Sequence, residues 1–155
     1  MDLSMWQRFT ERARAAVYFA QEEAVRRGIS YVGPECLLLG LTQDADAVAV
    51  AVLRAAGVDT DQLRSRLETL LSEGVADEVS QASLTPSAKR VVELAYTEAR
   101  ARGCDYIGTE HLLLGIALEG GDVSGLLAEL GGTADSLRAA ISRLPSDEMK
   151  GDPVG

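Results

Sequence analysis

The segment YVGPECLLLGL at residues 31–41 returns, little changed, as YIGTEHLLLGI at residues 106–116. The two copies lie 75 residues apart, and the same offset relates the residues on the amino-terminal side of each segment. A tandem duplication of this length predicts two copies of one small helical unit. Because one copy alone would bury little apolar surface, we expect the two to pack into a single body. A site built from repeated residues should then occur twice, around a pseudo-two-fold axis.

Each copy is predicted to begin with a long helix. Thr10 and Thr85 are suited to cap the free amides of a helix start, and Pro86 fits the first turn, where no amide hydrogen is needed. Gly28 and Gly103 supply the helix ends. Alanine and valine recur between these signals at three- and four-residue spacing, as on the buried face of a helix. The predicted ranges are 10–27 and 85–102.

Three further helices are expected in each copy. The second opens at residues 33–35 and 108–110, and its leucines are apolar on several sides, as in a central helix. The third is less certain from pattern, because residues 47–52 alternate and are β-branched, which is also typical of a strand. The corresponding segment, 122–130, does not alternate, so a helix is predicted in both copies, over 46–56 in the first. The fourth helices are predicted over 60–71 and 134–144, where the offset of 74 shows that the second copy has lost one residue.

These expectations define an all-α fold of two four-helix repeats packed pseudo-symmetrically within residues 1–145. The polar segment between the repeats indicates a flexible linker, and the proline- and glycine-containing end of the chain a flexible tail. The predicted boundaries are repeat 1 at about 9–72, linker at 72–83, repeat 2 at about 84–144 and tail at 146–155.

Composition excludes several classes of function. The net charge of −9 disfavours binding to nucleic acid or to an anionic membrane surface. No apolar run approaches the ~20 residues of a membrane span, and the amino terminus does not resemble a signal peptide. Cys36 and Cys104 do not occupy equivalent positions in the repeats and indicate ordinary thiols. A cytoplasmic location is the simplest expectation.

Three segments resemble the Clp N-terminal domain, in the double-repeat form that fronts ClpC-type AAA+ unfoldases. They are RFTERA at 8–13, LTPSAKRV at 84–91 and YIGTEHLLLG at 106–115, and the resemblance covers roughly residues 5–144. It implies an all-helical recognition domain without activity or cofactor of its own, which receives substrates and adaptor proteins for a protease-coupled unfoldase. The sequence contains no Gly-x-x-x-x-Gly-Lys-Ser/Thr phosphate loop. We therefore expect either a stand-alone protein or an isolated piece of a larger one.

The resemblance also implies a candidate site for phosphorylated arginine, a degradation mark bound by some ClpC-type domains. Gly108, Thr109 and Glu110 match the family pattern. A helix start offers amides and a positive dipole to the phosphate, the threonine adds a hydroxyl, and the glutamate can pair with the guanidinium. The alternative is structural, because a carboxylate in the first turn stabilises a helix by ~0.3–1 kcal/mol without any ligand.

The first copy matches this pattern less well. Gly33 and Glu35 are present, but Pro34 replaces the threonine and removes both a hydroxyl and a backbone donor. We expect the first site to be weakened, so that Glu110→Ala reduces phosphoarginine binding more than Glu35→Ala.

A second surface is implied by the same resemblance. Trp6, Phe9 and Lys89 occupy the positions where peptides and cyclic-peptide antibiotics dock on ClpC-type domains. Phe9 can alternatively be a core residue that staples the first helix. His111, the one histidine of the chain, is expected to be a packed residue, not a metal ligand or a base.

The function that these observations favour is non-catalytic recognition of marked substrates, adaptors or peptides as a partner of a ClpC-type unfoldase. An enzyme is not expected, because no nucleophile–base pair is indicated. The alternative is a stand-alone decoy or regulatory protein, which sequesters Clp ligands or has lost phosphoarginine binding.

Overall fold

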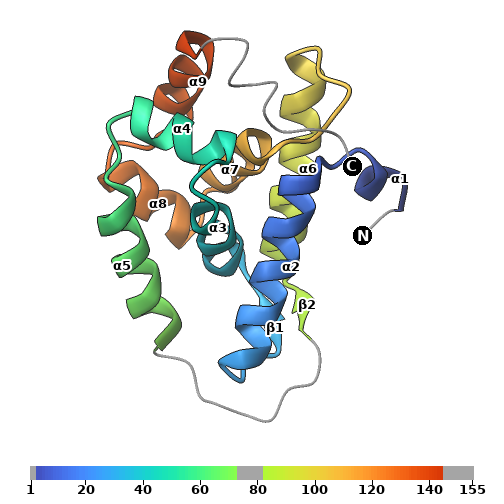
Figure 1. The fold of residues 1–155 in the computed structure, drawn as a ribbon, viewed down its shortest axis with the longest axis vertical. Coiled ribbons are helices and arrows are strands. Elements are labelled where there is room, and N and C mark those ends of the chain that lie inside the picture. Colours follow the sequence, from blue (N-terminus) through green and yellow to red (C-terminus); the bar gives the residue numbers. More distant parts are fainter. Residues whose placement is uncertain (1–2, 73–81, 145–155) are drawn as a thin grey trace.

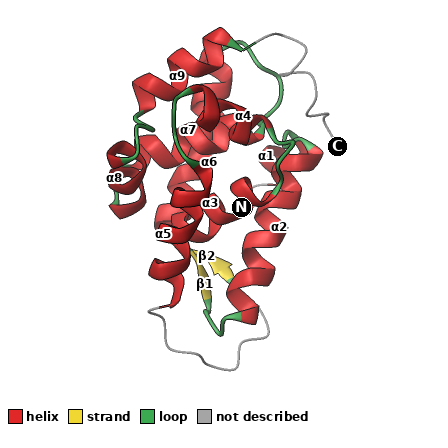
Figure 2. Ribbon diagram, turned by 60° about the vertical axis from the view of Figure 1, so that its left-hand side comes forward, coloured by secondary structure: helices red, strands yellow, loops and turns green. Residues whose placement is uncertain are grey.

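The structure, a computed structural model, describes residues 3–72 and 82–144, and these are almost entirely helical (Figures 1 and 2). The all-α prediction is confirmed, and so is the helix, not a strand, at residues 48–52. The middle of the expected linker and the whole expected tail lie outside the described residues.

Each repeat contains four helices. Those of the first repeat are α2 (Glu11–Arg26), α3 (Pro34–Gln43), α4 (Val48–Ala55) and α5 (Thr60–Ser72). Those of the second repeat are α6 (Pro86–Ala101), α7 (Thr109–Glu119), α8 (Asp122–Glu129) and α9 (Ala134–Arg143). A short additional helix, α1 (Leu3–Gln7), precedes them and was not predicted.

The long helices begin and end at the residues that the sequence indicated. The Thr10 hydroxyl accepts a hydrogen bond from the Ala13 amide at 3.1 Å, and the Thr85 hydroxyl accepts one from Ala88 at 3.0 Å. Gly28 and Gly103 both have φ of 73°, in the left-handed region that favours glycine after a helix.

The central helices α3 and α7 are gripped by their neighbours, with α2 and α6 along one side and α5 and α8 along the other (Figure 1). A glycine allows each close crossing. A Cβ on Gly40 would overlap the carbonyl oxygen of Ala16 in α2, and a Cβ on Gly115 would overlap that of Val91 in α6. The Leu-Leu-Leu-Gly motif therefore combines a buried apolar turn with a point where two helix backbones nearly touch.

The repeats are joined by two short stretches of β-type backbone hydrogen bonding, each between a segment of one repeat and a segment of the other. Two short strands, β1 (Tyr31–Val32) and β2 (Ser83–Leu84), pair in parallel, with Val32 opposite Leu84. The pseudo-symmetric counterpart is an isolated bridge between Phe9 and Ile107. In each case the residue before one repeat's first helix pairs with the residue before the other repeat's second helix. Neither strand was predicted, because their partners lie far apart in sequence.

The residue lost from the second repeat lies between α7 and α8. The connection there is Gly120–Gly121, against residues 44–47 in the first repeat, while α7 is one residue longer than α3. From this point the corresponding residues of the repeats are 74 apart, so α8 aligns with α4 and α9 with α5.

Candidate functional site

The second-repeat loop is closed over its own glutamate. Gly108 is the N-cap of α7, and a Cβ on it would overlap the Glu110 carboxylate, which folds back over the glycine. Glu110 is fully buried, at 0% exposure. A side chain at this position would have to displace the carboxylate from where it folds back. A ligand that pairs with Glu110 has to reach a group that solvent does not contact in this structure.

Thr109 connects the two repeats. Its hydroxyl oxygen accepts a hydrogen bond at 3.0 Å from the amide of Ala49, in the first turn of α4. The N-cap of α4 is Ala47, which has no side-chain oxygen, so Thr109 supplies the capping interaction from the other repeat. Thr109 is itself buried, and its hydroxyl thus has a structural partner at the place where a phosphate donor was expected.

His111 also acts within the loop. Its Nδ1 accepts a hydrogen bond from the Gly108 amide at 3.0 Å, and the Tyr106 ring lies 5.5 Å away. Burial lowers the pKa of His111 to about 4, with the charge of Arg102 adding to the effect. The other ring nitrogen, Nε2, is buried and meets no hydrogen-bond partner among the described residues. His111 is thus a neutral, packed residue at pH 7.

The first-repeat loop has the same backbone but is more open. Gly33 caps α3, and a Cβ there would come within 2.5 Å of Glu35 Oε1, so the carboxylate folds back as in the second repeat. Glu35 is only half-buried, whereas Pro34 is buried and has neither amide hydrogen nor hydroxyl to offer. Burial and the Glu35 charge raise the pKa of the Cys36 thiol to about 11. The first loop is more accessible but lacks the amide hydrogen and the hydroxyl at position 34, whereas the second has both at Thr109 but is closed.

The aromatic residues near the amino terminus form a small cluster. The Trp6 ring lies 5.0 Å from Phe9 and 5.5 Å, edge to face, from Tyr18. Trp6 belongs to α1, is half-buried and packs on the core, while Phe9 is fully buried within it. Lys89 is exposed on α6.

Tyr18, which was not among the predicted surface residues, is 54% exposed and lies beside Trp6. The sequence could have indicated it, because Tyr18 is an aromatic residue that lies outside the buried alanine-rich face of α2. Arg14 of the same helix donates hydrogen bonds to the carbonyl oxygens of Trp6 and Gln7, at 3.4 and 3.1 Å, and so holds the end of α1.

Glu23 and Glu98, which occupy equivalent positions in the repeats, are both buried, although acidic residues were expected on solvated helix faces. Burial alone would raise the pKa of Glu23, but hydrogen bonds from Arg26 and Arg27 outweigh it and lower that pKa. Glu98 receives a hydrogen bond from Arg138 Nε at 2.7 Å, which lowers the pKa of its carboxyl group and ties α6 to α9. Glu98 thus joins α6 to α9, while Glu23 pairs within α2 and is linked to α5 through Arg27, which also pairs with Glu68.

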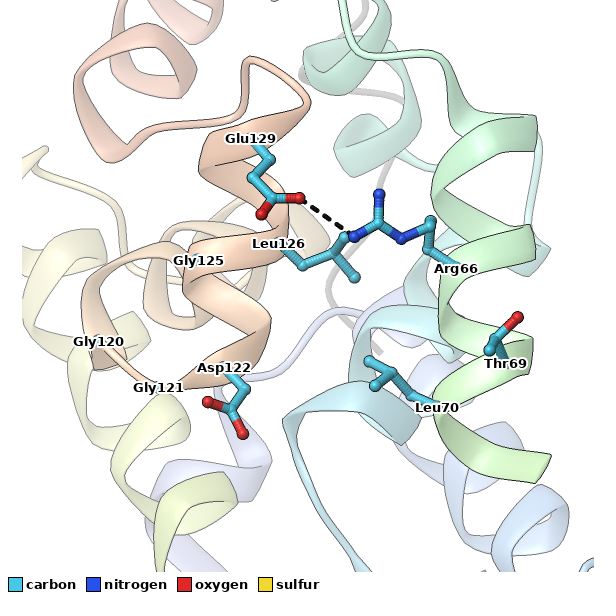
Figure 3. A pocket seen from close by; sticks show the side chains of 9 residues that line it. All are labelled: Arg66, Thr69, Leu70, Gly120, Gly121, Asp122, Gly125, Leu126 and Glu129. Carbon is cyan, nitrogen blue, oxygen red and sulfur yellow. Dashed lines mark hydrogen bonds and ion pairs between the residues drawn. The ribbon is translucent and has the colours of Figure 1, made fainter. Parts of the chain in front are cut away.

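A pocket of about 440 Å³ lies between α5 and α8 (Figure 3). It contains none of the predicted site residues. Within residues 3–72 and 82–144, no three His, Cys, Asp or Glu side chains come together in a way that could hold a metal ion. Over the same residues no single helix is long and apolar enough to cross a membrane, although two sharply bent helix pairs reach the required length and composition together.

Comparison with known proteins agrees with this geometry. The family model of the Clp repeat (R) N-terminal domain matches residues 8–130. The ClpC/MecB negative regulator of genetic competence of Bacillus subtilis (strain 168) is 40% identical over 142 residues, which are 90% of this chain and 17% of that protein. The chloroplastic chaperone protein ClpC2 of Oryza sativa subsp. japonica is 40% identical over 155 residues, 98% of this chain and 17% of that protein. The chain thus spans about a sixth of the length of these chaperones.

Solved structures give the same result. The N-terminal domain of the caseinolytic protease associated chaperone ClpD from Arabidopsis thaliana is 31% identical, has a TM-score of 0.65, and is matched over 94% of its chain and 88% of this one. A ClpV N-domain in complex with a VipB peptide has a TM-score of 0.75 at 14% identity, with 96% of its chain and 100% of this one matched, and so shares the fold. The duplicated helices, the backbone pairing between the repeats and these matches together show that the chain belongs to the Clp N-terminal domain family.

Proposed function

We propose that this chain is a non-catalytic recognition module that receives adaptor proteins or marked substrates for a ClpC-type unfoldase. The observation that carries the proposal is the pair of Gly-x-Glu helix starts at the family's motif positions (residues 33–35 and 108–110), in two repeats that pack on each other. Further support comes from the 40% identity to ClpC proteins, and from the peptide held by a ClpV N-domain of the same fold.

The state of the potential catalytic groups supports a binding role. His111 has its Nδ1 engaged by a backbone amide and a pKa of about 4, so it is a poor base at pH 7. The Cys36 thiol, with a pKa of about 11, is almost entirely protonated at that pH and is a poor nucleophile. Neither residue has the properties that acid–base or covalent catalysis requires.

For phosphoarginine, we infer that Gly108, Thr109 and Glu110 form the stronger site and that Gly33 and Glu35 form the weaker one. The second loop has the threonine hydroxyl and an amide at the position of Pro34, but its ligand must draw Glu110 out of the core. Only molecules in which Glu110 is already drawn out can bind, so the apparent affinity equals the intrinsic affinity multiplied by the fraction of such molecules.

Isosteric variants test this assignment. Calorimetric titration with free phosphoarginine should show a larger loss of affinity for Glu110→Gln than for Glu35→Gln, with circular dichroism confirming that both variants are folded. Equal losses would contradict the asymmetry. A larger loss for Glu35→Gln would instead assign binding to the more accessible first loop.

For peptides and cyclic-peptide antibiotics, we infer docking on Trp6 and Lys89, with Phe9 supporting Trp6 from within the core. Half-buried tryptophan is enriched at the centres of protein interfaces. Trp6→Ala should weaken peptide binding measured by calorimetry, a readout that does not depend on the chain's one tryptophan, and Lys89→Ala should reduce affinity without changing stability. Unchanged affinity in both variants would remove this surface from the proposal.

A second candidate is a decoy or regulatory protein that sequesters Clp ligands. The buried Glu110 and the Pro34 substitution favour the other form of this candidate, a regulatory protein that has lost phosphoarginine binding, because both reduce capture of that ligand. Adding the chain to a ClpC–ClpP degradation assay separates the two: faster proteolysis supports delivery, and slower proteolysis supports sequestration by mass action. No effect at any concentration would count against both candidates.

A further inference from the structure

The pseudo-symmetry of the fold is broken at one pair of helices. In one half, α4 packs directly on α9, and the Arg143 guanidinium donates a hydrogen bond to the Ala55 carbonyl at 2.8 Å. The counterpart pair, α8 and α5, is separated by the 440 Å³ pocket. Figure 3 shows an ion pair between Arg66 and Glu129 spanning the opening at 3.1 Å.

Residue substitutions between the repeats explain why one side is open. Thr69 on α5 stands where the long Arg143 stands on α9, so the short side chain at this position does not reach α8, and Arg66 alone of the α5 lining residues spans the gap. Asp122 on α8 stands where α4 has the buried Val48. The opening is therefore encoded by shorter and more polar residues, and the short Gly120–Gly121 loop, two residues against four in the first repeat, lies at its rim.

A further substitution widens the pocket. Gly125 takes the place of Ala51, and a Cβ built on Gly125 meets no atom within 4 Å. Glycine costs about 1 kcal/mol relative to alanine inside a helix, and no close packing requires it here. Its effect is to leave the α8 backbone accessible along this wall.

The chemistry of the walls defines what fits. Leu70 is 42% exposed and lies opposite Leu126, which gives the pocket an apolar floor. The carboxylates of Asp122 and Glu129 line one wall, and Asp122 has no ion-pair partner in the described part of the chain. Arg66 is the one cation among the lining residues, so the pocket is acidic overall, as is the chain, at −9. The volume is within the range of pockets that hold small ligands, of ~300–1,000 Å³, and suits a few residues of an extended chain.

We propose that this inter-repeat pocket binds a short basic segment of a partner polypeptide. An aliphatic side chain of the segment packs on Leu70 and Leu126, and a neighbouring lysine or arginine pairs with Asp122, because Glu129 already pairs with Arg66. The proposal rests on the recognition role inferred above, and it adds a site separate from both the helix-start loops and the Trp6 surface. Charge complementarity selects a cationic partner, because an acidic segment would face the Asp122 carboxylate, whereas the Glu129 charge is balanced by Arg66.

The test is fluorescence anisotropy of the chain with a fluorescein-labelled octapeptide of alternating leucine and lysine. Gly125→Leu fills the pocket and should weaken binding about tenfold or more, since it blocks the apolar contact. The variant should remain folded, because leucine favours a helix over glycine and the site is open to a Cβ. A thermal melt verifies this.

Charge is tested separately. Asp122→Asn should weaken binding about two- to fivefold at low salt, as expected for an exposed ion pair, and the difference should disappear at high salt. The matched control is Asp135→Asn, which removes the same charge from the first turn of α9. An equal effect of the two substitutions would mean non-specific attraction and would overturn the proposal.

The remaining outcomes are also decisive. Unchanged affinity in Gly125→Leu, or no binding by the unmodified chain at millimolar peptide, overturns the pocket. Peptide binding that is lost in Trp6→Ala but kept in Gly125→Leu overturns it while leaving the recognition role intact. The recognition role itself is judged by the degradation assay, which requires no peptide probe.

Discussion

Replacing Thr109 with valine tests whether the candidate loop is first of all a structural joint between the repeats. The Thr109 hydroxyl accepts the Ala49 amide hydrogen bond at 3.0 Å, and Ala49 is completely buried. Valine has nearly the same shape, so the substitution leaves no cavity but leaves a buried amide without its acceptor. An unsatisfied buried donor costs about 1–3 kcal/mol, so we expect a loss of roughly 2 kcal/mol.

Urea unfolding followed by circular dichroism measures this loss. With a slope of about 2 kcal/mol per molar urea, the midpoint should fall by about 1 M. Thr109→Ser keeps the hydroxyl and should recover much of the loss. The matched control is Thr97→Val, because the exposed Thr97 hydroxyl bonds only within α6, to the Glu93 carbonyl at 3.1 Å, and its removal should cost less than about 0.5 kcal/mol.

Equal midpoints for Thr109→Val and Thr97→Val would refute the reasoning. Such a result would mean that the Ala49 amide finds another acceptor, and that the repeats are not coupled through this hydroxyl.

Three further perturbations address packing and charge. Gly115→Ala should destabilise the protein by roughly 1–3 kcal/mol, because its Cβ overlaps a carbonyl of α6, whereas Gly125→Ala should raise Tm slightly; a melt in which both variants gain stability would contradict the close crossing. The pKa of His111 is about 4 in the native state and ~6.5 when unfolded, so between these values the unfolded chain binds more protons. Stability should therefore fall by about 2 kcal/mol from pH 7 to pH 5; His111→Asn should lose this dependence in urea titrations, and an unchanged profile would count against the burial argument. The pKa of Glu98 is lowered, so its contribution is present above the unfolded pKa of ~4.5 and lost as pH falls below it. Arg138→Ala should lower the free energy of unfolding by about 1–2 kcal/mol at pH 7, because it leaves the largely buried Glu98 carboxylate without its ion-pair partner. The loss should be smaller at pH 3, where more of the Glu98 carboxyl is protonated, and an equal loss at both pH values would contradict the ion-pair explanation.

Local signals were sufficient for most of the helices. Thr10 and Thr85 cap their helices as predicted, and left-handed glycines follow the two long helices, because capping and chain reversal depend on a few neighbouring residues. The alternating run at 47–52 was ambiguous alone. The duplicated copy resolved it correctly, since two copies of one unit share a fold.

Elements that depend on distant partners were not predicted. The strands β1 and β2 and the bridge from Phe9 to Ile107 exist because the repeats exchange segments across their interface. The short helix α1 is held by Arg14 and by packing of Trp6, neither of which leaves a periodic signal in five residues.

The amino-acid sequence by itself determined the duplication, the helix starts and stops, and the family motifs with their glycines and glutamates. Only the tertiary structure decided that Glu110 is enclosed while Glu35 is accessible, that Thr109 caps a helix of the other repeat, and that α5 and α8 stand apart while α4 and α9 touch. The reason is that capping and periodicity are properties of a few consecutive residues. Burial, cross-repeat hydrogen bonds and pocket volume depend instead on how two nearly identical halves meet, where single substitutions break the symmetry.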